Sequence, residues 1–162
     1  MTDRDGESPL YFACMTGKTE FVKLLLSSGA SPNKRKYPLH AACRGQHYDS
    51  VKLLLEYNAD VAVRDQNGKT ALHHALKSYE SNNYEINELV LQLLLDRGAD
   101  VNATSKNGES PFYIVCSMGM TSIAKKMLER GAKVDGSSSK KLPLIAACRL
   151  WDMSLVKLLL SK

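Results

Sequence analysis

The stretch GESPLYFAC at residues 6–14 returns almost unchanged as GESPFYIVC at residues 108–116. In both copies a Ser-Pro pair is followed by apolar residues, and a cysteine closes the segment. Two stretches this similar within one chain of 162 residues indicate an internal duplication, and further copies are therefore expected.

Three more segments share the pattern: YPLHAAC, TALHHAL and LPLIAAC. A second block follows each copy, as VKLLLSSGASPN, VKLLLEYNADVA, LQLLLDRGADVN, AKKMLERGAKVD and a shorter VKLLLSK. The spacings between copies are 29, 33, 40 and 32 residues, measured between Leu10, Leu39, Leu72, Phe112 and Leu144. Two blocks in a constant order at this period indicate tandem structural repeats.

Each repeat is typical of two short helices joined by a turn. A hydroxyl residue before the first helix can accept backbone N–H bonds, and proline is tolerated in the first helical turn. The residues in this position are Ser8, Thr70 and Ser110. The second helix carries an apolar stripe and stops at glycine, which takes the left-handed conformation without steric cost. These glycines are Gly29, Gly98 and Gly131.

The TPLHxA-like segments and the LLLxxGADVN-like blocks resemble the ankyrin repeat, and the resemblance covers residues 3–162. It implies an all-α solenoid of stacked helix-turn-helix units with β-hairpin turns. The five repeats are expected at about 3–33, 34–64, 65–102, 103–135 and 136–162, in one ankyrin-repeat domain. The third has a seven-residue insertion and the last is truncated, which leads us to expect a fragment of a longer array.

The composition is that of a folded globular chain, with 44% hydrophobic and 24% charged residues. No apolar run approaches the length of about 20 residues that spans a bilayer. The first residues lack the pattern of a secretory signal, which favours a cytoplasmic or nuclear location. A formal charge of +5 is too modest to indicate nucleic-acid binding. Neither a membrane nor a nucleic acid is therefore an expected partner.

No arrangement of residues predicts catalysis, a cofactor or a metal site, so we expect no enzyme. The four cysteines stand at one position of the repeat and are interpreted as small apolar residues between helices: Cys14, Cys43, Cys116 and Cys148. Stacked helices about 8–10 Å apart hold such positions too far apart for disulfides. His40 and His73 are interpreted as structural, and His47 and His74 as isolated.

The resemblance implies that function lies in a concave groove made from the turns and the exposed side of each first helix. Carried over by position, the candidate residues are Arg35, Lys36, Tyr37, Arg44, Lys69, Lys77, Lys106, Met118, Lys140, Lys141, Arg149 and Trp151. Basic residues outnumber acidic ones in this set. We therefore expect a monomeric protein-protein interaction module, within a larger scaffold or adaptor protein, that binds a partner protein or peptide with acidic residues.

Three departures from the repeat pattern stand out. The turn before Pro38 is shortened and reads KRKY, and an insertion that includes Tyr79–Glu85 separates the helices of the third repeat. This insertion is either a tolerated surface loop or a private contact site. Trp151 replaces a glycine, and it either anchors a partner at the groove or packs against a following repeat.

Two alternatives to the interaction module remain open at this stage. The repeats could be structural spacers in a larger protein. The PLxxAC variant is also similar to that of substrate-receptor subunits of ubiquitin ligases, which makes the substrate-recognition part of such a receptor the other alternative.

Overall fold

The structure is a computed structural model that describes residues 8–33, 37–77, 88–135 and 141–161. The described residues form ten α-helices and contain no β-strand, which confirms the expected all-α fold. In chain order the helices are α1 (Pro9–Met15), α2 (Thr19–Ser27), α3 (Pro38–Arg44), α4 (Tyr48–Glu56), α5 (Ala71–Lys77), α6 (Glu88–Asp96), α7 (Pro111–Ser117), α8 (Thr121–Glu129), α9 (Pro143–Arg149) and α10 (Met153–Leu160).

Serine starts two of the first helices, as the sequence predicted. The Oγ atom of Ser8 accepts a hydrogen bond from the Tyr11 N–H at 3.1 Å, and Ser110 accepts one from Tyr113 at the same distance. Helix α3 starts differently, because Tyr37 precedes it with a left-handed backbone (φ 53°) and without a side-chain cap. The shortened turn is therefore joined to its helix by a strained residue rather than by a cap.

Glycine stops the second helices. Gly29, Gly98 and Gly131 follow α2, α6 and α8 with φ values of 87°, 78° and 81°, in the region that glycine adopts most easily. Asn58 takes the same place after α4, with φ 61°. Asparagine is the residue that most often replaces glycine there, so the repeat keeps its helix end without the glycine.

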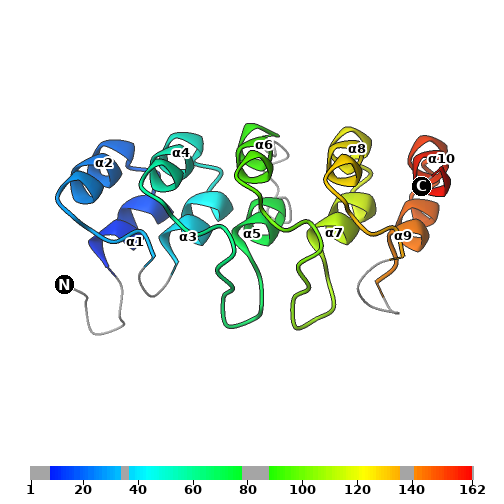
Figure 1. Cartoon of the computed structure of the whole chain (residues 1–162), viewed down its shortest axis with the longest axis horizontal. Helices are drawn as coiled ribbons and strands as arrows, with labels where there is room; N and C mark the ends of the chain where they lie inside the picture. Colours follow the sequence, from blue (N-terminus) through cyan, green and yellow to red (C-terminus); the bar gives the residue numbers. More distant parts are fainter. Residues whose placement is uncertain (1–7, 34–36, 78–87, 136–140, 162) are drawn as a thin grey trace. The chain divides into compact units, whose positions relative to one another are not determined.

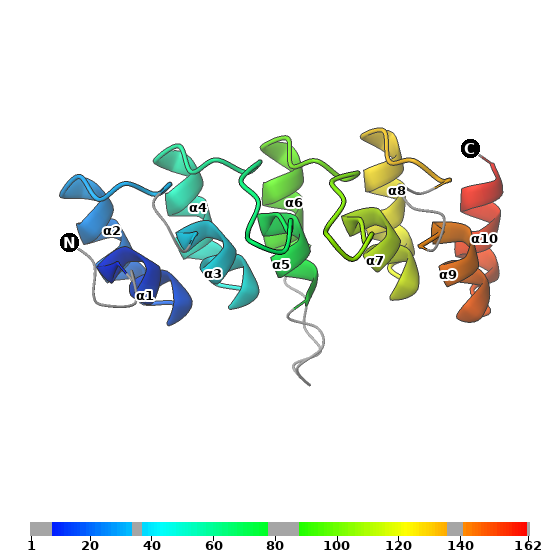
Figure 2. The ribbon, with the colours of Figure 1, turned by 90° about the horizontal axis from the view of Figure 1, so that it is seen from below.

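The described helices belong to two compact units. Unit 1 holds α1–α6, with α1, α3 and α5 side by side in one row and α2, α4 and α6 in a second row (Figures 1 and 2). Helix α3 packs between α1 and α5, and α4 packs between α2 and α6. The core of unit 1 therefore consists of apolar side chains between the rows and between neighbouring pairs, such as Leu10, Val22, Leu39, Leu54 and Leu72.

Unit 2 holds α7–α10 and the turn residues Asn67–Lys69. Helix α7 packs on α9 in the first row, and α8 packs on α10 in the second (Figure 1). The Oγ1 atom of Thr121 donates to the Asp152 carboxylate at 3.1 Å, which ties the start of α8 to the start of α10. The buried side chains of this unit include Phe112, Val115, Ile123, Met127 and Leu155.

Three cysteines are buried as predicted, and the prediction is wrong for the fourth. Cys14, Cys43 and Cys116 are inaccessible, and burial raises the pKa of Cys14 and of Cys116 to about 12 and that of Cys43 further. Cys148 is exposed. Cys43 lies in a helix with a neighbour on each side, whereas α9 packs on α7 and leaves Ile145 and Cys148 open on another side.

Candidate binding surface

The turn between α6 and α7 is closed by its own backbone. The Ser105 N–H donates to the Glu109 carbonyl at 2.9 Å, and the Gly108 N–H donates back to the Ser105 carbonyl at 2.9 Å. The Lys106 N–H donates to the Asn67 carbonyl at 2.9 Å, which joins this turn to the turn at Asn67–Lys69 within unit 2. The side chain of Lys106 is exposed at the tip of a turn that hydrogen bonds hold in place.

Charges alternate along one position of successive turns in unit 2. The residue immediately before the helix-capping position is Lys69, then Glu109, then Lys141. Lys141 Nζ lies 3.4 Å from Glu109 Oε1 and 5.2 Å from the centre of the Tyr113 ring. Lys141 is thus paired with an acid and stacked on an aromatic ring, so its charge is partly compensated at this position.

The ends of the first helices expose the side chains that the sequence placed in the groove. In unit 1, Met15 and Arg44 end α1 and α3 at the same position of the repeat, and both are exposed. In unit 2, Met118 follows α7 and is partly buried, and Arg149 ends α9 and is exposed. Each unit therefore presents one exposed arginine close to a methionine-bearing helix end.

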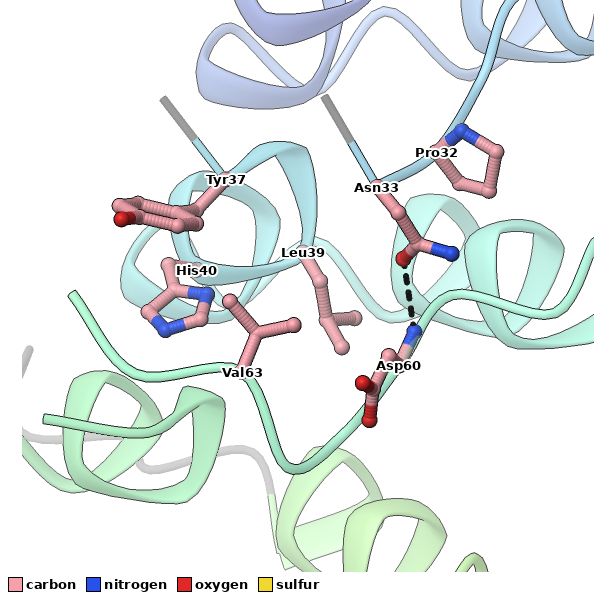
Figure 3. Close-up of a pocket in the computed structure, with 7 residues that line it drawn as sticks. All are labelled: Pro32, Asn33, Tyr37, Leu39, His40, Asp60 and Val63. Carbon is pink, nitrogen blue, oxygen red and sulfur yellow. Dashed lines mark hydrogen bonds between the residues drawn. The ribbon is translucent and has the colours of Figure 1, made fainter. Parts of the chain in front are cut away.

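A pocket in unit 1 opens beside the shortened turn (Figure 3). Its lining residues are Pro32, Asn33, Tyr37, Leu39, His40, Asp60 and Val63. The Tyr37 ring lies 5.0 Å from the His40 ring on one side of the pocket, and the Asp60 N–H donates to the Asn33 side chain at 2.8 Å on the other (Figure 3). Tyr37 is half-buried by this stacking, so it is part of the packing of the turn as well as a candidate contact.

The histidines have structural partners, so the expectation that His47 and His74 are isolated is wrong. His47 Nε2 lies 3.3 Å from the Met15 carbonyl oxygen, and His74 Nε2 lies 2.9 Å from the Asp65 carboxylate. The spacing along the chain hid these pairs, because each joins residues of different helices or turns. His73 is buried and accepts a bond from the Thr70 N–H at 3.1 Å, which fits its predicted structural role.

Two asparagines that were not among the predicted site residues brace neighbouring turns. Asn33 Nδ2 donates to the Asn58 carbonyl at 3.1 Å, and its Oδ1 accepts from Asp60. Asn102 makes the equivalent two bonds in unit 2. Its Nδ2 donates to the Gly131 carbonyl and its Oδ1 accepts from the Lys133 N–H, both at 2.9 Å. The signal was present in the sequence, because each asparagine stands three residues after the Gly-Ala pair.

Some candidates lie outside the described residues. These are Arg35, Lys36, Lys140 and the Tyr79–Glu85 insertion, and the side chain of Lys77 is also not described. Of the remaining candidates, Arg44, Lys106, Arg149 and Trp151 are exposed, and Tyr37, Lys69, Met118 and Lys141 are partly exposed. Trp151 follows α9 with a left-handed backbone (φ 57°) and is 89% exposed.

Neither a metal cluster nor a membrane span is seen in the described part of the chain. Among these residues no group of three or more His, Cys, Asp and Glu side chains could hold a metal ion. None of the described helices is long and apolar enough to cross a membrane. Hydrogen bonds lower the pKa of the Asp152 carboxyl: the Leu155 N–H has the largest effect, followed by the Thr121 hydroxyl and the Ser154 N–H.

The family is decided by a comparison with known proteins. The family model described as ankyrin repeats (3 copies) matches residues 10–92 and again residues 82–162. The chain belongs to the ankyrin-repeat family. This confirms the resemblance derived from the TPLHxA-like segments, and it fits the paired helices of both units.

The relatives are diverse. The human transient receptor potential cation channel subfamily A member 1 is 31% identical over 98% of this chain and 15% of its own length. The human ankyrin repeat and SOCS box protein 6 is 37% identical over 65% of this chain and 26% of its own length. The fowlpox virus putative ankyrin repeat protein FPV230 is 29% identical over 88% of this chain and 93% of its own length.

Most of these matches concern a part of the relative rather than the relative's whole length. The chain spans only 13% and 15% of the two channel-subfamily relatives that it matches. The domain itself is a protein-interaction module, because ankyrin repeats are a binding fold without catalytic machinery of their own.

Proposed function

We propose that each unit of this ankyrin-repeat domain binds an acidic segment of a partner protein on the surface formed by its own turns and the ends of its own first helices. The observation that carries the proposal is the exposure of Arg44 in unit 1 and of Lys106 and Arg149 in unit 2. Arginine holds a carboxylate with two parallel hydrogen bonds, which lysine does not reproduce. Arg44 is therefore the principal contact in unit 1, and Arg149 is the principal contact in unit 2.

Apolar side chains beside the arginines supply contact area. Met15 is exposed next to the position of Arg44 in the neighbouring helix of unit 1, and Met118 is partly exposed in unit 2. Methionine is unbranched and adapts to irregular surfaces, which suits the binding of an extended peptide. Tyr37 contributes the open part of its ring.

The overall charge favours the same class of partner. The chain carries 22 basic and 17 acidic side chains, a formal charge of +5, and such an excess raises the rate of encounter with acidic proteins. Glu109 compensates Lys141, so Lys141 adds less to this attraction than the exposed Arg44, Lys106 and Arg149 do. We assign no nucleic-acid, membrane, cofactor or catalytic role to this surface.

One alternative has support from a relative. The similarity to ankyrin and SOCS box protein 6 favours a role as the substrate-recognition part of a ubiquitin ligase receptor. Such a part would use the same surface, so the two proposals differ in what the rest of the protein does. A spacer role would leave the surface without a partner. The cytoplasm or nucleus stays the proposed location, because free thiols persist in a reducing compartment.

Peptide selection tests the proposal. A library of random 12-residue peptides is displayed and selected on the immobilised full chain, and the enriched sequences are tested against three proteins. These are the wild type, an Arg44→Glu/Arg149→Glu double variant, and a Lys52→Glu/Lys125→Glu control. The control makes the same charge change on exposed lysines of the second helices, again with one in each unit.

The expected result is enrichment of peptides with Asp and Glu that bind the wild type and the control but not the arginine variant. Peptides that bind all three proteins equally would contradict the proposed surface. Selection that yields no binder would favour the spacer role.

The monomeric state expected from the sequence is not part of this proposal, because the faces of α1–α2 and α9–α10 expose apolar side chains.

A further inference from the structure

We propose that the chain associates head to tail with a second copy of itself. The exposed face of α9–α10 in one copy packs on the exposed face of α1–α2 in the next, in the register that joins neighbouring helix pairs inside each unit. We call these the C-terminal face and the N-terminal face. The C-terminal face exposes Ile145, Trp151, Met153 and Leu160, and the N-terminal face exposes Phe12, Phe21 and Lys18.

The second helices show which side of each end pair is open. Helix α4 packs between α2 and α6, and four of its side chains are buried: Ser50, Val51, Leu54 and Leu55. In α2, which packs on α4, the equivalents of Val51 and Leu55 are buried, but the equivalent of Ser50 is Phe21 and is 63% exposed. The side of α2 that faces away from α4 is therefore open and apolar.

Helix α10 shows the opposite pattern. Leu155 and Leu159 stand at the positions of Ser50 and Leu54 and are buried, whereas Leu160 stands at the position of Leu55 and is 68% exposed. The open side of α10 thus corresponds to the side of α2 that α4 covers. The two end faces are the two halves of one kind of interface.

The first helices complete this match. In unit 1 the rings of His40 in α3 and His74 in α5 lie 5.0 Å apart across the contact between neighbouring pairs. Ile145 stands at the position of His40, and Phe12 stands at the position of His74. Both are exposed, so the same register between two copies places an isoleucine against a phenylalanine.

A second contact inside unit 1 predicts an apolar pair at the start of the second helices. Thr19 Oγ1 of α2 lies 3.4 Å from Ser50 Oγ of α4. Met153, 65% exposed, stands at the position of Thr19, and Phe21 stands at the position of Ser50. The hydroxyl pair inside the unit becomes a methionine and a phenylalanine at the ends, and sulfur–aromatic contacts of this kind are favourable.

The turn inside each helix pair predicts where Trp151 goes. Gly17 lies against the ring of His47, and Gly119 lies near the carboxylate of Asp152. In both cases the second residue after a first helix meets the residue that precedes the second helix of the next pair.

Trp151 takes the position of these glycines, in the same left-handed conformation. Lys18 takes the position of His47 and Asp152, and it is exposed. The register therefore puts the Trp151 ring beside the Lys18 ammonium of the next copy, a cation–π pair. This contact would account for an exposed tryptophan in an unfavourable backbone conformation.

Three independent positions thus give chemically matched pairs in one register. Such an interface is heterologous, because different faces meet, and it can extend from copy to copy until a ring closes. Sedimentation velocity of the full chain over its soluble concentration range tests the association. The weight-average mass is expected to rise above 17.9 kDa with concentration. A mass that stays at the monomer value throughout would overturn the proposal.

Single-face variants test the head-to-tail arrangement. Phe21→Glu blocks the N-terminal face and Met153→Glu blocks the C-terminal face, and both replace exposed side chains. Each variant alone should be monomeric, and an equimolar mixture should form dimers and nothing larger, since each variant keeps the face that the other lacks. A Tyr57→Glu control, at the exposed residue that follows α4, should associate as the wild type does. Association of Phe21→Glu alone would show a symmetric contact and refute the register.

Trp151→Gly separates association from folding. Glycine is the residue at the equivalent positions Gly17 and Gly119, so the variant should melt at a higher temperature than the wild type. Its association constant should nevertheless fall by at least about tenfold, because the cation–π pair and the aromatic area are lost. Unchanged association would exclude Trp151 from the interface and contradict the register that places it there.

Discussion

Single residues decide how each repeat begins, ends and meets its neighbour. Ser8 and Ser110 cap the first helices with bonds that span three residues. The cysteine position shows that the same residue type can be buried in one repeat and exposed in another. Cys43 is buried between flanking helices, and Cys148 is exposed at the same position of its repeat. Local sequence sets the helix, and the neighbouring helices set the exposure.

This difference predicts the thiol chemistry of the folded chain. A thiolate is the reacting form, and burial raises the pKa of Cys14 and Cys116 to about 12, so these thiols are both inaccessible and protonated at neutral pH. We expect a bulky maleimide to modify Cys148 first and to leave Cys14, Cys43 and Cys116 unmodified until the chain unfolds. Mass spectrometry of peptides after timed quenching measures each site, and urea-unfolded protein is the control. Rapid modification of all four in the native state would contradict the burial.

Elements are joined through side chains that bridge one turn to the next. Asn33 and Asn102 each donate to one backbone carbonyl and accept from one backbone N–H of the following turn. Neither bond pair is local in sequence, since the partners lie 25 to 31 residues away. Each asparagine therefore fixes the distance between the ends of two neighbouring second helices.

Removing one of these bridges should weaken unit 2 without changing its helices. Asn102→Ala loses two hydrogen bonds, each contributing about 0.5–1.5 kcal/mol, so the free energy of unfolding should fall by about 1–3 kcal/mol. Urea unfolding of the full chain, followed by circular dichroism, measures the change. Asn107→Ala, at an exposed turn position, is the matched control and should shift the midpoint little. Equal midpoints for the two variants would remove the bracing role from Asn102.

The elements were largely predictable, and the contacts between them were not. The Ser-Pro pairs and the Gly-Ala steps are local signals, and they predicted where α1, α2, α7 and α8 begin or end. The pairing of His74 with Asp65 and the bridge from Asn102 to Gly131 depend on how turns stack, and a single sequence shows no distances between turns. The exposure of Cys148 could not be predicted from the sequence for the same reason.

For the whole molecule, charge and exposed apolar area divide the surface into two kinds. The turns and first-helix ends carry the exposed cations Arg44, Lys106 and Arg149, and the end faces carry apolar side chains such as Phe21 and Met153. Polar, charged surfaces favour reversible recognition of charged segments, whereas apolar faces favour packing. The two proposals therefore use different parts of the chain, and substitutions can separate them.

An arginine at a first-helix end is the residue on which the proposed binding of an acidic partner depends. The most direct test is isothermal titration of one selected acidic peptide into the wild type, Arg44→Ala and the exposed second-helix control Lys52→Ala. We expect Arg44→Ala to weaken binding about tenfold or more, equivalent to at least about 1.4 kcal/mol, because a charge-assisted bond is lost. We expect the affinity of Lys52→Ala to be unchanged. Equal affinities for the wild type and Arg44→Ala would show that Arg44 does not hold the acidic peptide.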